Sequence, residues 1–263
     1  MSADILPAVR LRGPLARVNP LARLACALLL ALPLIASLDV VSGIVALALE
    51  VPLILACRIP WRTFWLRTSP IWIAAPLGGI TIALYGQTSG TVHVEWLLVR
   101  VSDGSLLLAA ATVLRMLAIA LPGVVLFIGV DPTDLADGLA QRARLPARFV
   151  LGALGGLRMA GLLVGDWREL ETARRARGVA DEGRVRRFVG MAFALVVLAI
   201  RRGSALATAM EAKAFGSARR RTWARESPWG RREWALAACG PAISAVALAA
   251  AVWAGAFNPI FGE

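Results

Sequence analysis

Residues 105–130 have the sequence SLLLAAATVLRMLAIALPGVVLFIGV, which is apolar except for one charge at Arg115. A helix needs about 20 predominantly apolar residues to cross the hydrocarbon core of a bilayer, and this stretch is long enough. Hydrophobic residues make up 58% of the whole chain, a larger share than soluble domains usually have. The stretch therefore predicts a membrane-spanning helix in an all-α polytopic membrane protein.

Four further apolar runs predict four more spans: residues 21–38, 40–57, 69–85 and 234–257. The arginines before the first run resemble those of a signal peptide. Because the second run follows at once, we interpret the two as a retained pair of spans. We therefore expect an N-terminal membrane domain of four spans in residues 1–130 and a C-terminal span in residues 233–263.

The distribution of cations predicts the orientation of the chain. The net charge is +12, and this model of five spans places 27 of the 29 Lys and Arg residues on one side. Positive residues accumulate on the cytoplasmic side of membrane proteins, so we expect a plasma-membrane protein with its N-terminus inside. In a soluble protein this charge would indicate nucleic acid; here we expect membrane lipid as the partner and no nucleic acid.

Residues 131–232 are too charged for ordinary spans and too apolar for a plain loop, and we interpret them as a cytosolic coupling domain. Residues 131–134 are typical of a turn and helix cap. We expect helices at about 134–142, 146–177 and 187–215, with Pro146 opening the second and Gly178 ending it. The third helix is fully apolar only over residues 188–200, so it is interfacial or partly embedded; a sixth span is the alternative.

The second of these helices carries small residues at intervals of four, Gly152, Gly156 and Ala160. Small residues at this spacing allow another helix to cross closely, which predicts a helix-packing face. The alternative is that the spacing only reflects a chain rich in glycine and alanine.

Two related tripeptides end the two long helices: Ala176-Arg177-Gly178, and Ala212-Lys213-Ala214 with the only lysine of the chain. Each places a cation between small residues, where it can enter a groove on another protein. A cation is also favoured at the C-terminal end of a helix by the helix dipole. The pair indicates docking rather than catalysis, although the first tripeptide could also belong to a solvated arginine run.

These motifs resemble those of a known family. The chain is similar to the transmembrane T components of energy-coupling factor transporters, a group that includes the cobalt-importer permease subunit. The resemblance rests on residues 19–24 (NPLARL), 114–115 (LR), 131–135 (DPTDL), 173–178 (ARRARG) and 209–216 (AMEAKAFG).

The resemblance implies partners and a function. It implies two ABC ATPase subunits, identical or mixed, whose grooves receive Ala176, Arg177 and Gly178 and then Ala212, Lys213 and Ala214. It also implies a small membrane S component that binds a vitamin or a transition-metal ion for uptake. The second motif departs from the family pattern. Its lysine keeps the charge but lacks the bidentate fork of arginine, and alanine replaces glycine, with Gly216 as the candidate for the chain exit.

The sequence favours a non-catalytic subunit without a cofactor. It has no G-x-x-x-x-G-K-[ST] pattern, so ATP hydrolysis belongs to the partners. His93, Glu95 and Asp103 match no metal-ligand spacing, so we expect no metal site. One alternative is a conventional ABC importer permease, but its E-A-A-x-x-x-G loop is matched here only with one extra residue before Gly178. The other is an integral-membrane enzyme, which would need clusters of acidic residues or histidines.

Glu50 and Arg115 are the charges deepest in the apolar runs, each about ten residues from the outer end of its span. Intramembrane charges are costly and usually have a partner, so the equal depth predicts an ion pair. The alternative is that Arg115 reaches the interface and Glu50 is protonated.

Overall fold

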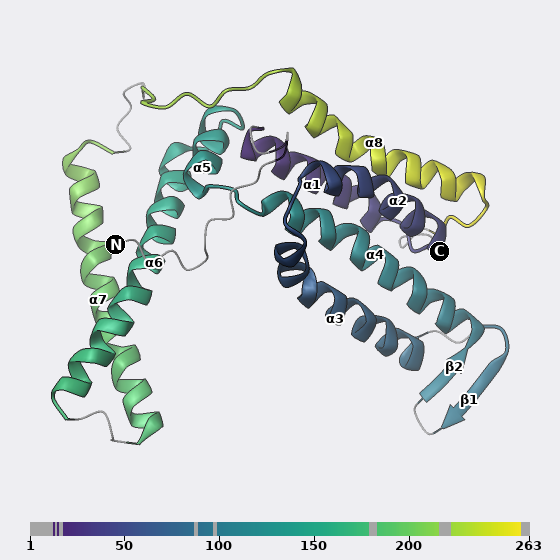
Figure 1. The fold of residues 1–263 in the computed structure, drawn as a ribbon, viewed down its shortest axis with the longest axis horizontal. Coiled ribbons are helices and arrows are strands. Elements are labelled where there is room, and N and C mark those ends of the chain that lie inside the picture. Colours follow the sequence, from purple (N-terminus) through teal and green to yellow (C-terminus); the bar gives the residue numbers. More distant parts are fainter. Residues whose placement is uncertain are drawn as a thin grey trace. The chain divides into compact units, whose positions relative to one another are not determined.

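The computed structural model describes residues 13, 15, 18–86, 89–96, 99–178, 183–215 and 222–258. This part of the chain forms eight helices, which confirms the predicted all-α membrane fold (Figure 1). The helices are α1 Pro20–Ile35, α2 Val40–Ala56, α3 Trp61–Tyr85, α4 Asp103–Phe127, α5 Pro132–Gln141, α6 Ala147–Ala176, α7 Arg184–Ala212 and α8 Arg231–Trp253. A small antiparallel hairpin of strands β1 Val92–Trp96 and β2 Val99–Ser102, which we did not predict, joins α3 to α4.

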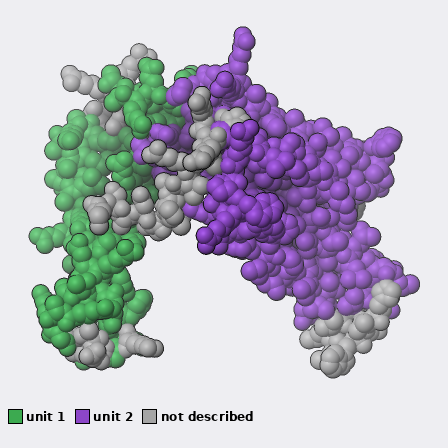
Figure 2. All heavy atoms as spheres, viewed as in Figure 1, with its two compact units in different colours: residues 1–8, 136–227 green, residues 9–135, 228–263 purple. Residues whose placement is uncertain are grey.

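The chain divides into two compact units, coloured separately in Figure 2. The bundle unit contains residues 9–135 and 228–263, and the α6–α7 unit contains residues 136–227 together with residues 1–8, which lie outside the described part. The α6–α7 unit falls within the predicted coupling domain of residues 131–232, and its boundaries lie a few residues inside.

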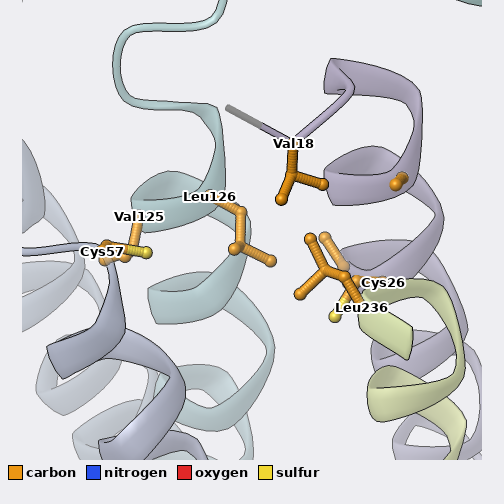
Figure 3. Packing of buried hydrophobic residues seen from close by; sticks show 8 residues of the cluster. Val18, Cys26, Cys57, Val125, Leu126 and Leu236 are labelled. Atoms are coloured by element: carbon orange, nitrogen blue, oxygen red, sulfur yellow. The ribbon is translucent and has the colours of Figure 1, made fainter. Parts of the chain in front are cut away.

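The bundle unit is organised around α4, which packs against α1, α2 and α3, while α8 packs on α1 and α2. Figure 3 shows part of the core, where Cys26 of α1, Val125 and Leu126 of α4 and Leu236 of α8 come together. Local signals start these helices: the Asn19 side chain accepts the Leu21 N–H at 3.0 Å and caps α1.

Glycines set the closest helix crossings of the bundle unit. A Cβ added to Gly240 of α8 would lie 2.3 Å from the carbonyl oxygen of Cys26 in α1. A Cβ on Gly79 of α3 would lie 2.3 Å from Cγ2 of Val113 in α4. Helices approach this closely only where the side chain is missing. Neither glycine was predicted from the sequence to lie at a helix crossing.

Five helices are long and apolar enough to cross a membrane by length and composition: α3, α4, α6, α8 and residues 185–212 of α7. The chain is thus a multi-pass membrane protein. α1 and α2 have only 16 and 17 residues, about 24–26 Å at 1.5 Å per residue, which is shorter than the hydrocarbon core of about 30 Å. Since α6 and α7 have sufficient length to span, the cytosolic placement of α6 and the interfacial or partly embedded placement of α7 stay predictions.

The local signals of the coupling region are confirmed. Asp131 accepts the Thr133 N–H at 2.7 Å through its side chain, in the predicted cap of α5. Pro146 is the N-cap of α6, and Gly178 follows its end with a φ of +72°. α7 begins three residues earlier than predicted, at Arg184.

Candidate functional site: two helix ends of the α6–α7 unit

α6 and α7 form an antiparallel pair. Near the end of α6 and the start of α7, the Trp167 and Phe188 rings lie 5.6 Å apart, and Arg187 donates to Glu171 at 2.5 Å. Toward the opposite ends of the two helices, Gly155 faces Leu206. A bidentate ion pair lies between these points: Arg202 binds both carboxylate oxygens of Asp166, with Nη2 3.0 Å from Oδ1.

The first motif ends α6. Arg177 is the C-cap with φ −86° and ψ 0°, and its N–H donates to the Ala173 carbonyl at 3.2 Å. Gly178 follows in the left-handed region at φ +72°, and its N–H donates to the Arg175 carbonyl at 3.1 Å. Glycine takes this conformation without steric cost, as it often does after a helix. The residues of the motif are exposed.

The second motif ends α7 in the same way. Lys213 is the C-cap with φ −89° and ψ 17°, and Ala214 follows at φ +54°. The Ala214 N–H donates to the Glu211 carbonyl at 2.8 Å, and the Phe215 N–H donates to the Met210 carbonyl at 3.0 Å. These two bonds make a complete Schellman motif.

Ala214 therefore makes the left-handed exit that we had assigned to Gly216, which lies outside the described residues. A Cβ in the left-handed region costs roughly 1–2 kcal/mol. Both ends nevertheless present the same arrangement, in which a cation caps the helix and a small residue turns the chain away. Exposed residues surround both cations, so each is accessible to another protein.

The two motifs lie at opposite ends of one helix pair. α7 has 29 residues, so an antiparallel arrangement separates the two ends by about 44 Å, at 1.5 Å per residue. The two motifs are thus separate in space and do not form parts of one site. This separation follows from the direction of α7 relative to α6, which no local pattern in the sequence predicts.

Comparison with known proteins identifies the family of this chain. The model of the CbiQ family of cobalt transport proteins matches residues 12–223, which include both motifs. The chain belongs to this family. It is also 27% identical over 189 residues to a protein of Limosilactobacillus fermentum named energy-coupling factor transporter transmembrane protein EcfT, and the match covers 66% of this chain and 69% of that protein. The family resemblance predicted from the motifs is confirmed.

The predicted helix-packing face of α6 is exposed in the isolated chain. Gly152 and Gly156 are exposed, with no described atom within 4 Å of an added Cβ, and Ala160 is exposed as well. The large apolar side chains of Phe149 and Leu157 on the same helix are more than half exposed. Within the described residues, no helix of this chain crosses that face.

The structure does not bring Glu50 and Arg115 together. Arg115 donates from Nη2 to the carbonyl oxygen of Ile35 at 2.5 Å, where the end of α1 leaves carbonyl groups without helical partners. Glu50 is fully buried, and neither carboxylate oxygen has a hydrogen-bond partner in the described part of the chain. The predicted ion pair is therefore replaced by a side-chain contact to a helix end.

Of the residues His93, Glu95 and Asp103, the structure describes the side chain of Asp103. Asp103 begins α4, and its carboxylate accepts a hydrogen bond from the Thr91 hydroxyl. The side chains of His93 and Glu95 lie outside the described residues, so the expectation of no metal stays a prediction.

Sequence reasoning missed Gln141 and Arg142, which bind the segment before α8. The Gln141 side chain hydrogen-bonds to main-chain atoms of Arg225 and Ser227, and the Arg142 side chain donates to the Ser227 carbonyl. No sequence signal could have shown this, because their partners lie more than 80 positions away and are backbone atoms that every residue carries.

Proposed function

We propose that this chain is the T component of an energy-coupling factor importer, a non-catalytic subunit that joins two ABC ATPases to a separate substrate-binding membrane protein. One observation carries the proposal: two exposed cations, Arg177 and Lys213, cap the two ends of one helix pair with the same backbone geometry. The name of the L. fermentum relative supports it.

Two docking points about 44 Å apart, at 1.5 Å per residue of α7, call for two grooves rather than one. A pair of ABC ATPases provides two such grooves, one on each subunit. Each groove then holds carboxylates for the incoming cation, because a charge-assisted hydrogen bond is about twice as strong as a neutral one. When ATP draws the two ATPases together, the two motifs receive the movement at opposite ends of the α6–α7 pair.

The open face of α6 is the proposed contact for the S component. Gly152, Gly156 and Ala160 let a partner helix approach the α6 backbone, and Phe149 and Leu157 supply apolar area beside them. Substrate specificity then resides in the S component, for a transition-metal ion or a vitamin. The family description makes cobalt the first substrate to test.

We further propose that the N-terminus and both motifs face the cytosol, where the ATPases are. The 27-of-29 distribution of cations supports this orientation. A cysteine introduced as Gly178→Cys should react with an impermeant maleimide in inside-out vesicles and not in intact cells. Labelling in intact cells would contradict the proposed topology.

Charge reversal tests the coupling role. Arg177→Glu should remove the ATPases from the purified complex and abolish uptake, since losses of several kcal/mol are common at a desolvated charge pair. Lys213→Glu should act in the same direction, and Lys213→Arg should retain or strengthen binding because arginine adds the planar fork. Arg201→Glu, on the exposed part of α7 outside the motif, is the matched control and should keep the ATPases. Wild-type co-purification of the ATPases with Arg177→Glu would refute the proposal.

A further inference from the structure

The segment that joins α7 to α8 is bound to the end of α5 by four hydrogen bonds. Gln141 donates from Nε2 to the Arg225 carbonyl oxygen at 2.8 Å and accepts the Ser227 N–H at 2.9 Å. Arg142 donates from Nε and Nη2 to the Ser227 carbonyl oxygen at 2.9 and 2.8 Å. We call residues 141, 142, 225 and 227 the α5 clamp; all four belong to the α6–α7 unit.

The geometry of the clamp is specific. The Gln141 amide carries both a donor and an acceptor, so one side chain binds the C=O of Arg225 and the N–H of Ser227, two residues later. The planar guanidinium of Arg142 directs two donors at one oxygen, which a lysine cannot reproduce. Trp223 adds apolar contact by packing near the buried Ala136, Ala140 and Val150. The segment is therefore bound by polar and apolar contacts together.

Directly after the clamp, the chain enters the bundle unit and is anchored again. The Pro228 carbonyl accepts a hydrogen bond from Asn19 Nδ2 at 3.0 Å, and Asn19 is also the cap of α1. The Gly230 N–H donates to Glu233 at 2.8 Å and starts α8. Four covalently consecutive residues, 227–230, thus lead from the clamp to the N-terminal ends of α1 and α8.

A loose connection could not transmit movement here. A chain from Ala214 to Arg231 can span up to about 56 Å, at about 3.3 Å per residue. Without a further contact, α7 could therefore move without displacing α8. Fixing Ser227 on α5 leaves only the short stretch up to Arg231, with a reach of about 13 Å. Any displacement of α5 then acts on α8 directly.

We propose that Gln141 and Arg142 are positioning residues that transmit ATPase-driven movement of the α6–α7 unit to the N-terminal ends of α8 and α1. This inference rests on the proposed coupling function, but it assigns a role to residues outside both motifs. The motifs receive the movement, and the α5 clamp passes it to the bundle unit.

The test uses the complex purified with its ATPases and reconstituted with its S component. Arg231→Cys places a thiol at the exposed start of α8, and its reaction rate with an impermeant maleimide is measured with ATP and without nucleotide. The same complex without this substitution corrects for Cys26, Cys57 and Cys239. With the clamp intact, ATP should change the labelling rate; with Gln141→Ala and Arg142→Ala together, this dependence should be lost while the ATPases still co-purify.

Two conservative variants distinguish a loss of ATP-dependent labelling from a loss of the folded structure. Arg142→Lys keeps the charge and loses the fork, and Gln141→Glu keeps the acceptor for Ser227 and loses the donor for Arg225. Each should reduce the ATP dependence of labelling in part, with the thermal midpoint of the complex nearly unchanged. Arg168→Ala, which removes an exposed arginine of α6, is the matched control and should behave as wild type.

The outcomes separate the clamp from the coupling function. If the double variant keeps the ATP dependence, or if it loses the ATPases together with that dependence, the transmitting role is wrong while the motifs keep theirs. Absence of any ATP effect at residue 231 in a wild-type complex that retains its ATPases also overturns the role of the clamp. A wild-type chain that retains no ATPases would instead overturn the proposed function.

Discussion

The bundle unit and the α6–α7 unit use small residues in opposite ways. In the bundle, Gly240 and Gly79 lie where an added Cβ would meet atoms of the facing helix at 2.3 Å. On α6, Gly152 and Gly156 have no described atom within 4 Å of that position. The same residue type thus completes a contact within the chain in one region and leaves a contact available to another protein in the other.

Burial shows the same difference. Nine of the 25 residues of α4 are buried, whereas only Val150 and Asp166 are buried among the 30 residues of α6. A helix that buries so little within its own chain gains little from apolar packing. The α6–α7 pair is therefore stabilised locally by its ion pairs and helix ends, and we expect the remaining stabilisation from partner proteins or lipid.

The largest change in stability should come from replacing a glycine by valine in the bundle unit, compared with the same replacement in the α6–α7 unit. Gly240→Val should destabilise the bundle by about 3 kcal/mol or more, because the new methyl groups meet the backbone of α1, which cannot move aside. Gly156→Val should change the stability of the isolated chain by less than about 1 kcal/mol, since its surroundings are open.

Thermal unfolding in detergent, followed by size-exclusion chromatography, measures both changes. Gly156→Val should also weaken retention of the S component. An equal loss of stability for the two variants would show that α6 is packed in the free chain.

A smaller effect should follow from removing the central ion pair of the α6–α7 unit. Asp166→Ala leaves Arg202 without its carboxylate in a partly buried position, which should cost about 2 kcal/mol, less than for a fully buried pair. Amide hydrogen exchange should rise within α6 and α7 and remain unchanged in α4. Arg175→Ala removes only the exposed pair with Glu171 and is the matched control, with an expected cost below about 1 kcal/mol. Faster exchange in α4 would mean that the two units unfold together.

Exchanging the residues at the two helix ends should change the local stability of these ends slightly, in opposite directions. Ala214→Gly removes the Cβ from a left-handed position and should stabilise the end of α7 by about 1 kcal/mol. Gly178→Ala introduces the same penalty at the end of α6. Hydrogen exchange of the Ala214 and Gly178 amides, which donate to Glu211 and Arg175, reports each end separately. Effects of the same sign would contradict the common backbone geometry of the two motifs.

The smallest expected free energy is the coupling energy between Glu50 and Arg115. Because Arg115 donates to Ile35 and Glu50 has no described partner, the stability losses of Glu50→Gln and Arg115→Leu should add to within about 0.5 kcal/mol in a double-mutant cycle. Thermal or urea unfolding of the four proteins measures this coupling. A larger coupling energy would restore the ion pair predicted from their equal depth.

Features that depend on neighbouring residues were predicted well. The Asp131 cap, Pro146 at the start of α6 and the left-handed Gly178 after it are all decided by hydrogen bonds and backbone angles within a few residues. The β1–β2 hairpin was missed because the two residues between its strands, Leu97 and Leu98, are not the glycine, asparagine or aspartate that mark a hairpin turn. The left-handed Ala214 was missed because glycine is the usual residue there and the propensity argument favoured Gly216.

By itself, the sequence determined the membrane class, the order of the helices, the end of α6 at Gly178 and the two cationic motifs, because apolar run length, caps and small residues act locally. It did not determine the start of α3 at Trp61 or of α7 at Arg184, both of which lie before the predicted starts. Only the tertiary structure decided that Gly240 and Gly79 are crossing points and Gly156 is not, that Arg115 binds Ile35 instead of Glu50, and that Gln141 and Arg142 bind the segment before α8. Each of these depends on which distant backbone atom lies opposite a side chain. Every residue except proline offers the same carbonyl and N–H groups, so no pattern along the chain can select that partner.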